Sequence, residues 1–231
     1  LTTPPNARLE IVRTLADAGK PILMEKPVER TLEAATDIVT LCEARGVPLG
    51  IMLQHRARPV VAELRALLPS LGALQAVEVA VPWWRPQAYY NEAGRGSYAR
   101  DGGGVLISQA IHTLDLMLSL TGPVSEVTAM AATTGFHAME AEDFVAAGLR
   151  FANGAVGHLF ATTASFPGKG ETITLHCRDG SAHLEAGILR VARQDGSEQV
   201  FGQAASSGAG ADPMAFTSDW HRFVIEDFAQ A

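Results

Sequence analysis

GGGVLISQAIHTLDLMLSLTG, residues 102–122, is the stretch around which the rest of the chain is arranged. Three glycines precede a segment whose apolar residues recur at helical spacing, and Gly122 with Pro123 ends that segment. At about 100° per residue, four polar side chains fall on one line of the expected helix. They are Ser108, His112, Asp115 and Ser119. This polar line either faces solvent, as in an ordinary amphipathic helix, or lines a pocket in which His112 moves a proton near neutral pH.

Before this helix, the first 55 residues alternate between short apolar runs and helical patterns. Residues 21–24 and 49–53 are typical of buried parallel strands. Helices are expected at residues 6–18, with Asn6 as the cap, and at residues 31–45. The order strand end, helix, strand, helix, strand is a βαβ pattern, and it predicts a parallel sheet.

Glu25, Lys26 and Pro27 come directly after the first complete strand of this pattern. Ligands of open parallel sheets bind outside the carboxyl ends of the strands. A lysine at such a position can hold a substrate hydroxyl or carbonyl and can shift its own pKa. The alternative is a charged tripeptide in a surface loop.

After residue 55 the pattern changes to helix 58–68, strand 74–81 and then, beyond the central helix, a series of short strand-like runs separated by turn dipeptides. They predict one antiparallel sheet of about five to seven strands, with the central helix packed on one face. The expected strands are 125–133, 143–151, 155–165, 171–177, 181–185 and 188–193. The GAGAD sequence in the Gly-rich loop 202–212 is not a dinucleotide fingerprint, because no strand leads into it.

Residues 82–101 form a long irregular segment rich in tryptophan, tyrosine and arginine. A loop of this length in a compact domain is usually functional, since arginine binds carboxylate or phosphate and aromatic rings stack on sugars. The alternative is a structural loop packed on its neighbours.

Other candidate groups are weaker. Glu140, Glu142 and Asp143 are either a paired-carboxylate site or, as we favour, a solvated turn. The remaining histidines lack metal-ligand spacing, so they are interpreted as structural and no metal site is predicted; they are His55, His137, His158, His176, His183 and His221.

Composition excludes several classes of function. The 231 residues are 47% hydrophobic and carry a net charge of −7 without a basic run, which disfavours nucleic acid and anionic membrane as partners. No apolar stretch approaches the roughly 20 residues of a membrane span, and no signal peptide is visible. Two distant cysteines form no disulfide framework, so a cytoplasmic location is expected. The chain does not begin with methionine and both ends read as interrupted elements, so we expect a fragment of a longer protein.

Taken together, these pieces resemble the glucose–fructose oxidoreductase / inositol dehydrogenase / rhizopine catabolism (Gfo/Idh/MocA) family. The resemblance covers essentially the whole chain. Each motif is weak alone, but the set is specific: Glu25-Lys26-Pro27 about 75 residues before the glycines, and a helical histidine eight residues after the last of them. The other matching stretches are Thr3-Pro4-Pro5-Asn6, the W-R-x(4)-Y segment from Trp84, GGGVLISQAIHTLDL, the Glu142-Asp143 strand and Phe151-Ala152-Asn153-Gly154-Ala155.

The resemblance implies the C-terminal part of a dinucleotide-binding Rossmann domain at residues 1–55. It implies an α/β substrate-binding and oligomerisation domain at 56–231, with an open, mainly antiparallel sheet and helices on one face. The fold class is thus α/β plus α+β. Such proteins use NAD or NADP to oxidise an alcohol of a sugar, cyclitol, sugar nucleotide or related diol, and homodimers or homotetramers through the open sheet are expected.

The resemblance also assigns roles to residues. Lys26 would bind the reacting hydroxyl and His112 would act as general base, which agrees with the reasoning from the residues themselves. The positions expected to edge the cofactor are Thr3, Pro4, Asn6, Glu25, Lys26 and Pro27, with Trp84 and Arg85 near it. The positions expected near the substrate are Arg85, Tyr90, Ser108, Gln109 and Asp115.

Two departures from the family pattern matter. Ser108 stands where many members carry Asp or Asn, which weakly favours sugar-nucleotide or diol substrates over free inositol. The Gly-rich phosphate loop would lie before Leu1, so we expect that residues 1–231 alone do not bind NAD(P) usefully. The alternative function is a non-catalytic ligand-sensing or interaction module on the same scaffold; the presence of Lys26 and His112 argues against it, since a sensor needs no base.

Overall fold

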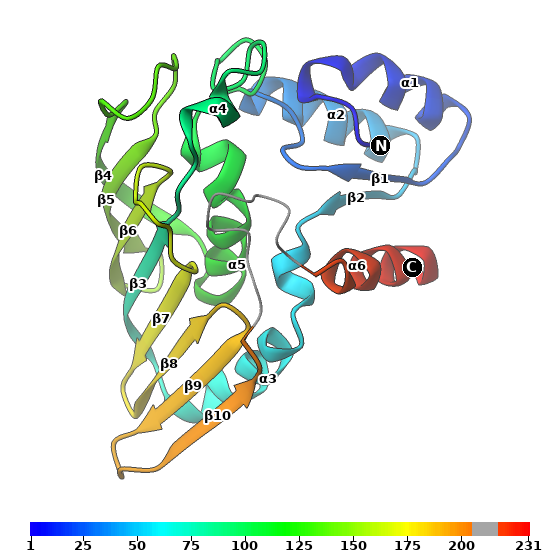
Figure 1. Cartoon of the computed structure of the whole chain (residues 1–231). Helices are drawn as coiled ribbons and strands as arrows, with labels where there is room; N and C mark the ends of the chain where they lie inside the picture. Colours follow the sequence, from blue (N-terminus) through cyan, green and yellow to red (C-terminus); the bar gives the residue numbers. More distant parts are fainter. Residues whose placement is uncertain (205–216) are drawn as a thin grey trace.

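The computed structural model describes residues 1–204 and 217–231, and its strands form two separate sheets. In the smaller sheet, β1 (Ile22–Glu25) pairs in parallel with β2 (Leu49–Met52), as the βαβ pattern predicts. Figure 1 shows α1 (Leu9–Asp17) and α2 (Leu32–Ala44) on one side of this pair and α6 (Asp219–Gln230) on the other. The buried side chains between the strands and the first two helices are Val12, Ala16, Ile22, Met24, Ile38, Cys42 and Val47.

The ends of these helices follow from local chemistry, with one correction. Thr31 caps α2, because its hydroxyl accepts a hydrogen bond from the backbone N–H of Ala34 at 3.2 Å. The prediction that Asn6 caps the first helix is wrong. A short 3₁₀ helix, η1 (Pro5–Ala7), comes first, and α1 begins at Leu9 without a side-chain cap. Arg8 separates the two helices and turns inward, with only 2% of its surface exposed.

The larger sheet has eight strands in the order β10-β9-β8-β7-β3-β6-β5-β4. Every neighbouring pair is antiparallel except β3 with β6, so β3 lies in the middle of strands that follow it in sequence. The prediction of five to seven antiparallel strands was therefore incomplete. Alternation of polar and apolar residues cannot show which strand inserts where. β10 is mostly exposed, and only Phe201 packs against the core. The strands are β3 (Leu74–Pro82), β4 (Val124–Ala132), β5 (Phe144–Phe151), β6 (Val156–Thr162), β7 (Thr172–Cys177), β8 (Gly180–Glu185), β9 (Ile188–Arg193) and β10 (Glu198–Gly202).

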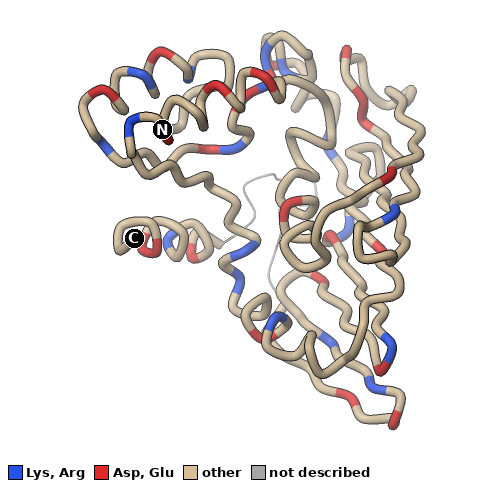
Figure 2. Tube along the Cα trace, turned by 180° about the vertical axis from the view of Figure 1, so that it is seen from behind, with Lys and Arg blue, Asp and Glu red and all other residues tan. Residues whose placement is uncertain are grey.

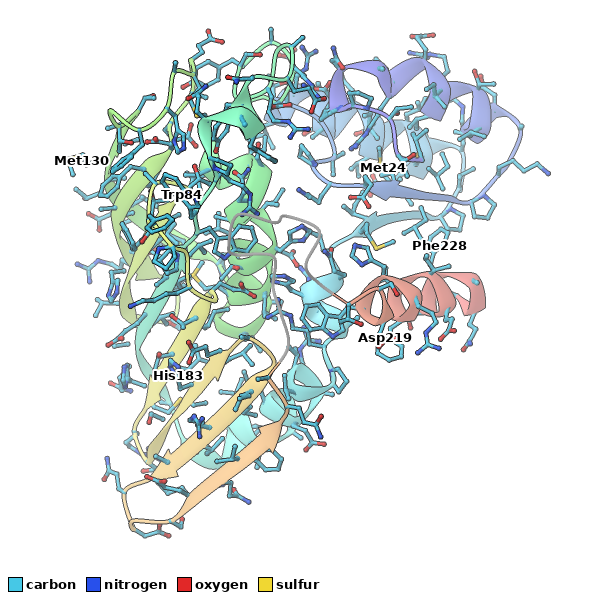
Figure 3. The ribbon with its side chains drawn as sticks, viewed as in Figure 1. Met24, Trp84, Met130, His183, Asp219 and Phe228 are labelled. Atoms are coloured by element: carbon cyan, nitrogen blue, oxygen red, sulfur yellow. The ribbon has the colours of Figure 1, made fainter. Side chains whose placement is uncertain are left out.

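One face of the larger sheet is covered by α5 (Ile111–Thr121) and α3 (Pro59–Leu67), as Figure 1 shows. The core lies between them, and its fully buried members include Leu64, Val79, Val81, Leu116, Met117 and Leu175. The opposite face carries exposed apolar side chains. Met130 is 62% exposed and Val156 is 47% exposed, and Met130 points away from α5 in Figure 3.

The central helix does not begin as an α-helix. Residues Leu106–Ala110 form a π-helical turn, η4, which leads directly into α5. Such turns occur frequently at functional sites. The side chain of Glu142 accepts hydrogen bonds from the backbone N–H groups of Gly104 at 2.9 Å and Leu106 at 3.2 Å, while its carbonyl accepts from Val105 at 2.8 Å. Glu142 therefore caps this helix. It belongs neither to a paired-carboxylate site nor to a solvated turn, the two roles considered from the sequence.

The chain between the two sheets runs through η2 (Gln54–Ala57), and η3 (Leu68–Leu71) follows α3. Residues 82–101 contain one short helix, α4 (Gln87–Tyr90). Figure 2 shows basic and acidic residues interspersed along the trace. Across the described residues, no helix combines the length and apolar character needed to cross a bilayer.

Candidate active site

Lys26 lies at the carboxyl end of β1 and reaches the other part of the chain. Its Nζ donates a hydrogen bond to the carbonyl oxygen of Ser108, at 2.8 Å, within the π-helical turn. Burial lowers the pKa of Lys26, while the negative charge of Glu25 opposes that shift. An ammonium group has three N–H donors, so the bond to Ser108 leaves others for a ligand. The structure thus brings together two residues that are 82 positions apart.

Arg8 holds the turn that carries Lys26. Its Nε donates to the carbonyl oxygen of Thr3 at 3.0 Å, and its Nη1 donates to the carbonyl oxygens of Glu25 and Pro27. The arginine therefore joins the start of the chain to both sides of Lys26. The sequence analysis missed this residue, because an arginine in the first turn of the helix expected at residues 6–18 has the same appearance as an exposed one.

His112 lies on α5, four residues after Ser108, and is 7% exposed. Burial lowers its pKa well below the ordinary value of 6.5, and the positive charges of Lys26 and Arg58 lower it further. Its Nδ1 atom is buried and makes no hydrogen bond with any described residue. The imidazole is therefore neutral at pH 7, which is the form that accepts a proton.

Two neighbouring cavities meet at Lys26. The first has a volume of about 350 Å³ and is lined by the 2–5 segment, Arg8, residues 25–27 and the 89–109 region. The second, of about 250 Å³, is lined by Lys26 and His112 together with side chains from four other segments. Both cavities include Glu25, Lys26, Tyr89, Ser108 and Gln109, so they form the two sides of one site.

Arg85 belongs to the second cavity and is 3% exposed. Its guanidinium lies 5.2 Å from the ring centroid of Trp83 and 5.6 Å from that of Tyr89, within the range of cation–π contacts. Its backbone is fixed on both sides, because its N–H donates to the carbonyl of Thr163 at 2.9 Å and its carbonyl accepts from His137 at 2.8 Å.

His137 is in turn held by Asp143, whose carboxylate lies 2.6 Å from its Nδ1. The two side chains are completely buried, and Asp143 also accepts hydrogen bonds from the backbone and the hydroxyl of Thr134, each at 2.7 Å. Asp143 is thus part of a buried network that positions Arg85, and not part of a solvated turn. The interpretation of His137 as structural agrees with these contacts.

We expect Asp143→Ala to lower the free energy of unfolding by about 3 kcal/mol, because His137 and Thr134 lose buried hydrogen bonds. Urea denaturation measures this change. The control is Asp17→Ala, which removes an exposed ion pair with Arg45 and should cost less than about 1 kcal/mol. Equal losses in the two variants would contradict a supporting role for the Asp143 network.

Several residues expected in the site lie elsewhere. The ring of Trp84 packs against Phe136 and Phe166, with centroids 5.8 and 5.4 Å away, and the residue lines neither cavity; Figure 3 places it at the sheet, far from Met24 of the small sheet. Asp115 binds Arg56 through two hydrogen bonds of 2.5 and 2.6 Å. Asn6 is exposed and also lines neither cavity. The remaining candidates do line the site: Thr3, Pro4, Glu25, Lys26, Pro27, Arg85, Tyr90, Ser108, Gln109 and His112.

Three residues interpreted otherwise or missed in the sequence also line the second cavity: His55, Trp220 and His221. His55 lies in η2, three residues after the end of β2, so the rule that placed Lys26 at the sheet edge could have found it. Trp220 and His221 belong to α6, and no sequence signal places that helix beside the site. The GAGAD sequence lies outside the described residues.

Family models match both parts of the chain. A family model for the GFO/IDH/MocA C-terminal domain matches residues 61–183, and a model for an oxidoreductase family with an NAD-binding Rossmann fold matches residues 1–53. The 1,5-anhydro-D-fructose reductase of Ensifer adhaerens is 31% identical over 173 residues, which are 71% of this chain and 49% of that protein.

Solved structures share the fold of this chain. The WlbA dehydrogenase from Bordetella pertussis, in complex with NADH and UDP-GlcNAcA, matches with a TM-score of 0.76 and 31% identity, over 81% of this chain and 55% of that one. Levoglucosan dehydrogenase in complex with NADH and levoglucosan has a TM-score of 0.79 and 24% identity, over 98% of this chain and 67% of its own, and shows the fold alone. The chain spans about half the length of curated relatives such as the reductase.

Proposed function

The chain belongs to the GFO/IDH/MocA family of oxidoreductases, and we propose that it carries the catalytic groups of an NAD- or NADP-dependent dehydrogenase. The substrate is a secondary alcohol of a sugar, cyclitol, sugar nucleotide or related diol. One observation carries the proposal: a buried lysine and a neutral buried histidine line the same cavity beside the carboxyl end of a parallel strand. The NADH and sugar ligands named for the WlbA and levoglucosan dehydrogenase structures support it.

The first cavity fits the reactive end of a dinucleotide. It lies at the carboxyl end of β1, where open parallel sheets bind such ligands. Its lining includes Thr3, whose hydroxyl is buried and has no hydrogen-bond partner among the described residues. The 2–5 segment, Glu25 and Pro27 would edge the nicotinamide. When bound there, that ring supplies the acceptor for a hydride.

Within this chain, the chemistry divides between two side chains. Lys26 donates a hydrogen bond to the oxygen of the reacting hydroxyl, and its bond to the Ser108 carbonyl fixes its direction. His112 takes the hydroxyl proton on its imidazole nitrogen as the carbon loses hydride. Gln109 and Arg85, both buried in the same cavity, would orient the remaining polar groups of the substrate.

We further propose that residues 1–55 and 56–231 act as separate domains. The first edges the cofactor, and the second supplies His112 and the substrate contacts. The exposed apolar face of the larger sheet, with Met130 and Val156, would bury itself in a homodimer or homotetramer.

The test is a screen of the full-length protein with NAD and NADP against sugars, cyclitols, sugar nucleotides and diols, followed by absorbance of the reduced cofactor. We expect turnover of at least one polyol-like alcohol. For that substrate, kcat/KM should fall with decreasing pH only below the ordinary histidine value of 6.5, because burial disfavours the protonated, inactive form of His112. Ligand binding without any turnover would favour the sensing alternative.

A further inference from the structure

His55 lies beside the two catalytic candidates because of the sheet topology. β1 and β2 are parallel neighbours, with Glu25 opposite Met52, so the residues that follow each strand meet at one edge of the sheet. Lys26 follows the first strand, and η2 with His55 follows the second. The side chain of His55 is 4% exposed and lines the same cavity as Lys26 and His112.

The protonation state of His55 is determined by Arg58. Nη2 of Arg58 lies 2.6 Å from Nε2 of His55. A guanidinium only donates hydrogen bonds, so Nε2 must be the acceptor and the ring hydrogen must be on Nδ1. Burial, followed by the charge of Arg58, lowers the pKa of His55 well below 6.5, which keeps this ring neutral.

Arg58 itself is held by a rigid frame. The same Nη2 donates to Oε1 of Glu171 at 2.6 Å, and both side chains are almost fully buried. The guanidinium also lies 4.3 Å from the ring centroid of Trp220 in α6. His55 is therefore fixed by groups from the larger sheet and from the C-terminal helix.

The ring of His55 packs against the ring of His112. Their centroids are 5.0 Å apart and the planes are inclined by 33°. Nδ1 of His112 makes no hydrogen bond with a described residue, so within the described chain no carboxylate orients this imidazole. Instead, the ring of His55 packs against this imidazole and restricts its orientation.

The charged groups around the pair come from several elements. Glu25 ends β1 and Lys26 follows it, Arg58 with its partner Glu171 contacts His55, and His221 lies on α6. Arg85 lines the same cavity. A neutral ring between Arg58 and His112 also excludes water from the face of His112 that it covers.

We propose that His55 is a positioning residue for the general base: its ring packs against His112, holds the orientation of that imidazole and keeps it dry. The inference rests on the proposed role of His112. It predicts that the shape of the His55 ring matters and that its nitrogen atoms do not.

The experiment compares His55→Ala, which removes the ring, with His55→Phe, which keeps a flat ring of similar size. Arg58 retains Glu171 and Trp220 in both variants. The first measurement is an NMR titration of protein labelled with ¹³C-histidine, which follows the protonation of His112 without a substrate. The ring loss in His55→Ala should admit water and raise the pKa of His112 toward the ordinary value, whereas His55→Phe should titrate like the wild type.

The second measurement is steady-state kinetics across pH. The alanine variant should lose about 10- to 100-fold in kcat with little change in KM, since a displaced base affects the chemical step. Its acid limb should move to higher pH, and the phenylalanine variant should restore both properties. His158→Ala, on the exposed face of β6, is the control and should change neither.

Equal defects in the two variants would overturn the proposal, because a ring nitrogen of His55 and not the ring shape would then be required. An unchanged titration and kcat in His55→Ala would overturn it as well. The titration separates this inference from the proposed function: a wild-type protein without dehydrogenase activity would contradict the function, while the NMR result would still test the contact between the two rings.

Discussion

Removal of either catalytic group should lower kcat by about 100- to 10,000-fold while the fold remains intact, because proton transfer by a positioned side chain contributes about that much. The variants are Lys26→Ala and His112→Ala in the full-length protein. Without Lys26 the reacting hydroxyl would lose its hydrogen-bond donor, and without His112 it would lose the group assigned to take its proton. Initial rates with the substrate found by the screen measure the loss.

Lys20→Ala and His158→Ala are the matched controls, since both residues are exposed and line neither cavity of the site. Circular dichroism should show the same secondary structure for all four variants. Near-wild-type rates in Lys26→Ala and His112→Ala would contradict the assignment of roles, whatever reaction the protein catalyses.

Gly104→Ala should lower the free energy of unfolding by about 3 kcal/mol and abolish turnover. A Cβ atom at this position would lie 1.7 Å from the carbonyl oxygen of Glu142. Relief of that overlap requires the two backbones to separate, at the cost of packing and of the hydrogen bonds that Glu142 makes to the start of the central helix. Urea denaturation measures the stability, and the same rate assay measures the activity.

Gly135→Ala is the control for this substitution, because nothing lies within 4 Å of a Cβ added there. It should change the stability by less than about 0.5 kcal/mol. If Gly104→Ala is as mild as this control, the close approach of the 102–104 segment to Glu142 is not needed for the fold.

The sequence predicted the elements whose patterns are local. The small parallel sheet, α2 and most strands of the large sheet were expected within a few residues of their observed bounds. Lys26 was found because the position of a residue at the end of a buried strand can be read from the sequence, and its edge of the sheet then follows from topology.

The tertiary contacts of a side chain could not be predicted from the local sequence pattern. A helical wheel aligned Asp115 with His112 correctly, but it could not show that one faces Arg56 while the other faces a cavity. A helical wheel also does not reveal the π-helical turn, because it assumes the same α-helical hydrogen-bond pattern at every residue. Arg8 and Trp220 enter the site through contacts across the chain, and neither has a local signal.

The environments of the carboxylates Glu142 and Asp143 could not be predicted from the sequence either. Acidic residues before a strand usually belong to a solvated turn, and this prior was wrong for Glu142 and Asp143. Each is surrounded by donors from a distant segment: the N–H groups of the 104–106 backbone for one, and His137 with Thr134 for the other. Only the tertiary structure supplies these partners.

The hydrogen bond from Lys26 to residue 108 allows substrate specificity to change without loss of the lysine's anchor. The acceptor is a main-chain carbonyl, which every amino acid carries, so mutation of residue 108 leaves the lysine anchored. The side chain at that position lines both halves of the site and can be exchanged for one that suits a different alcohol. A lineage could therefore change its substrate at residue 108 by single mutations and keep its chemistry throughout.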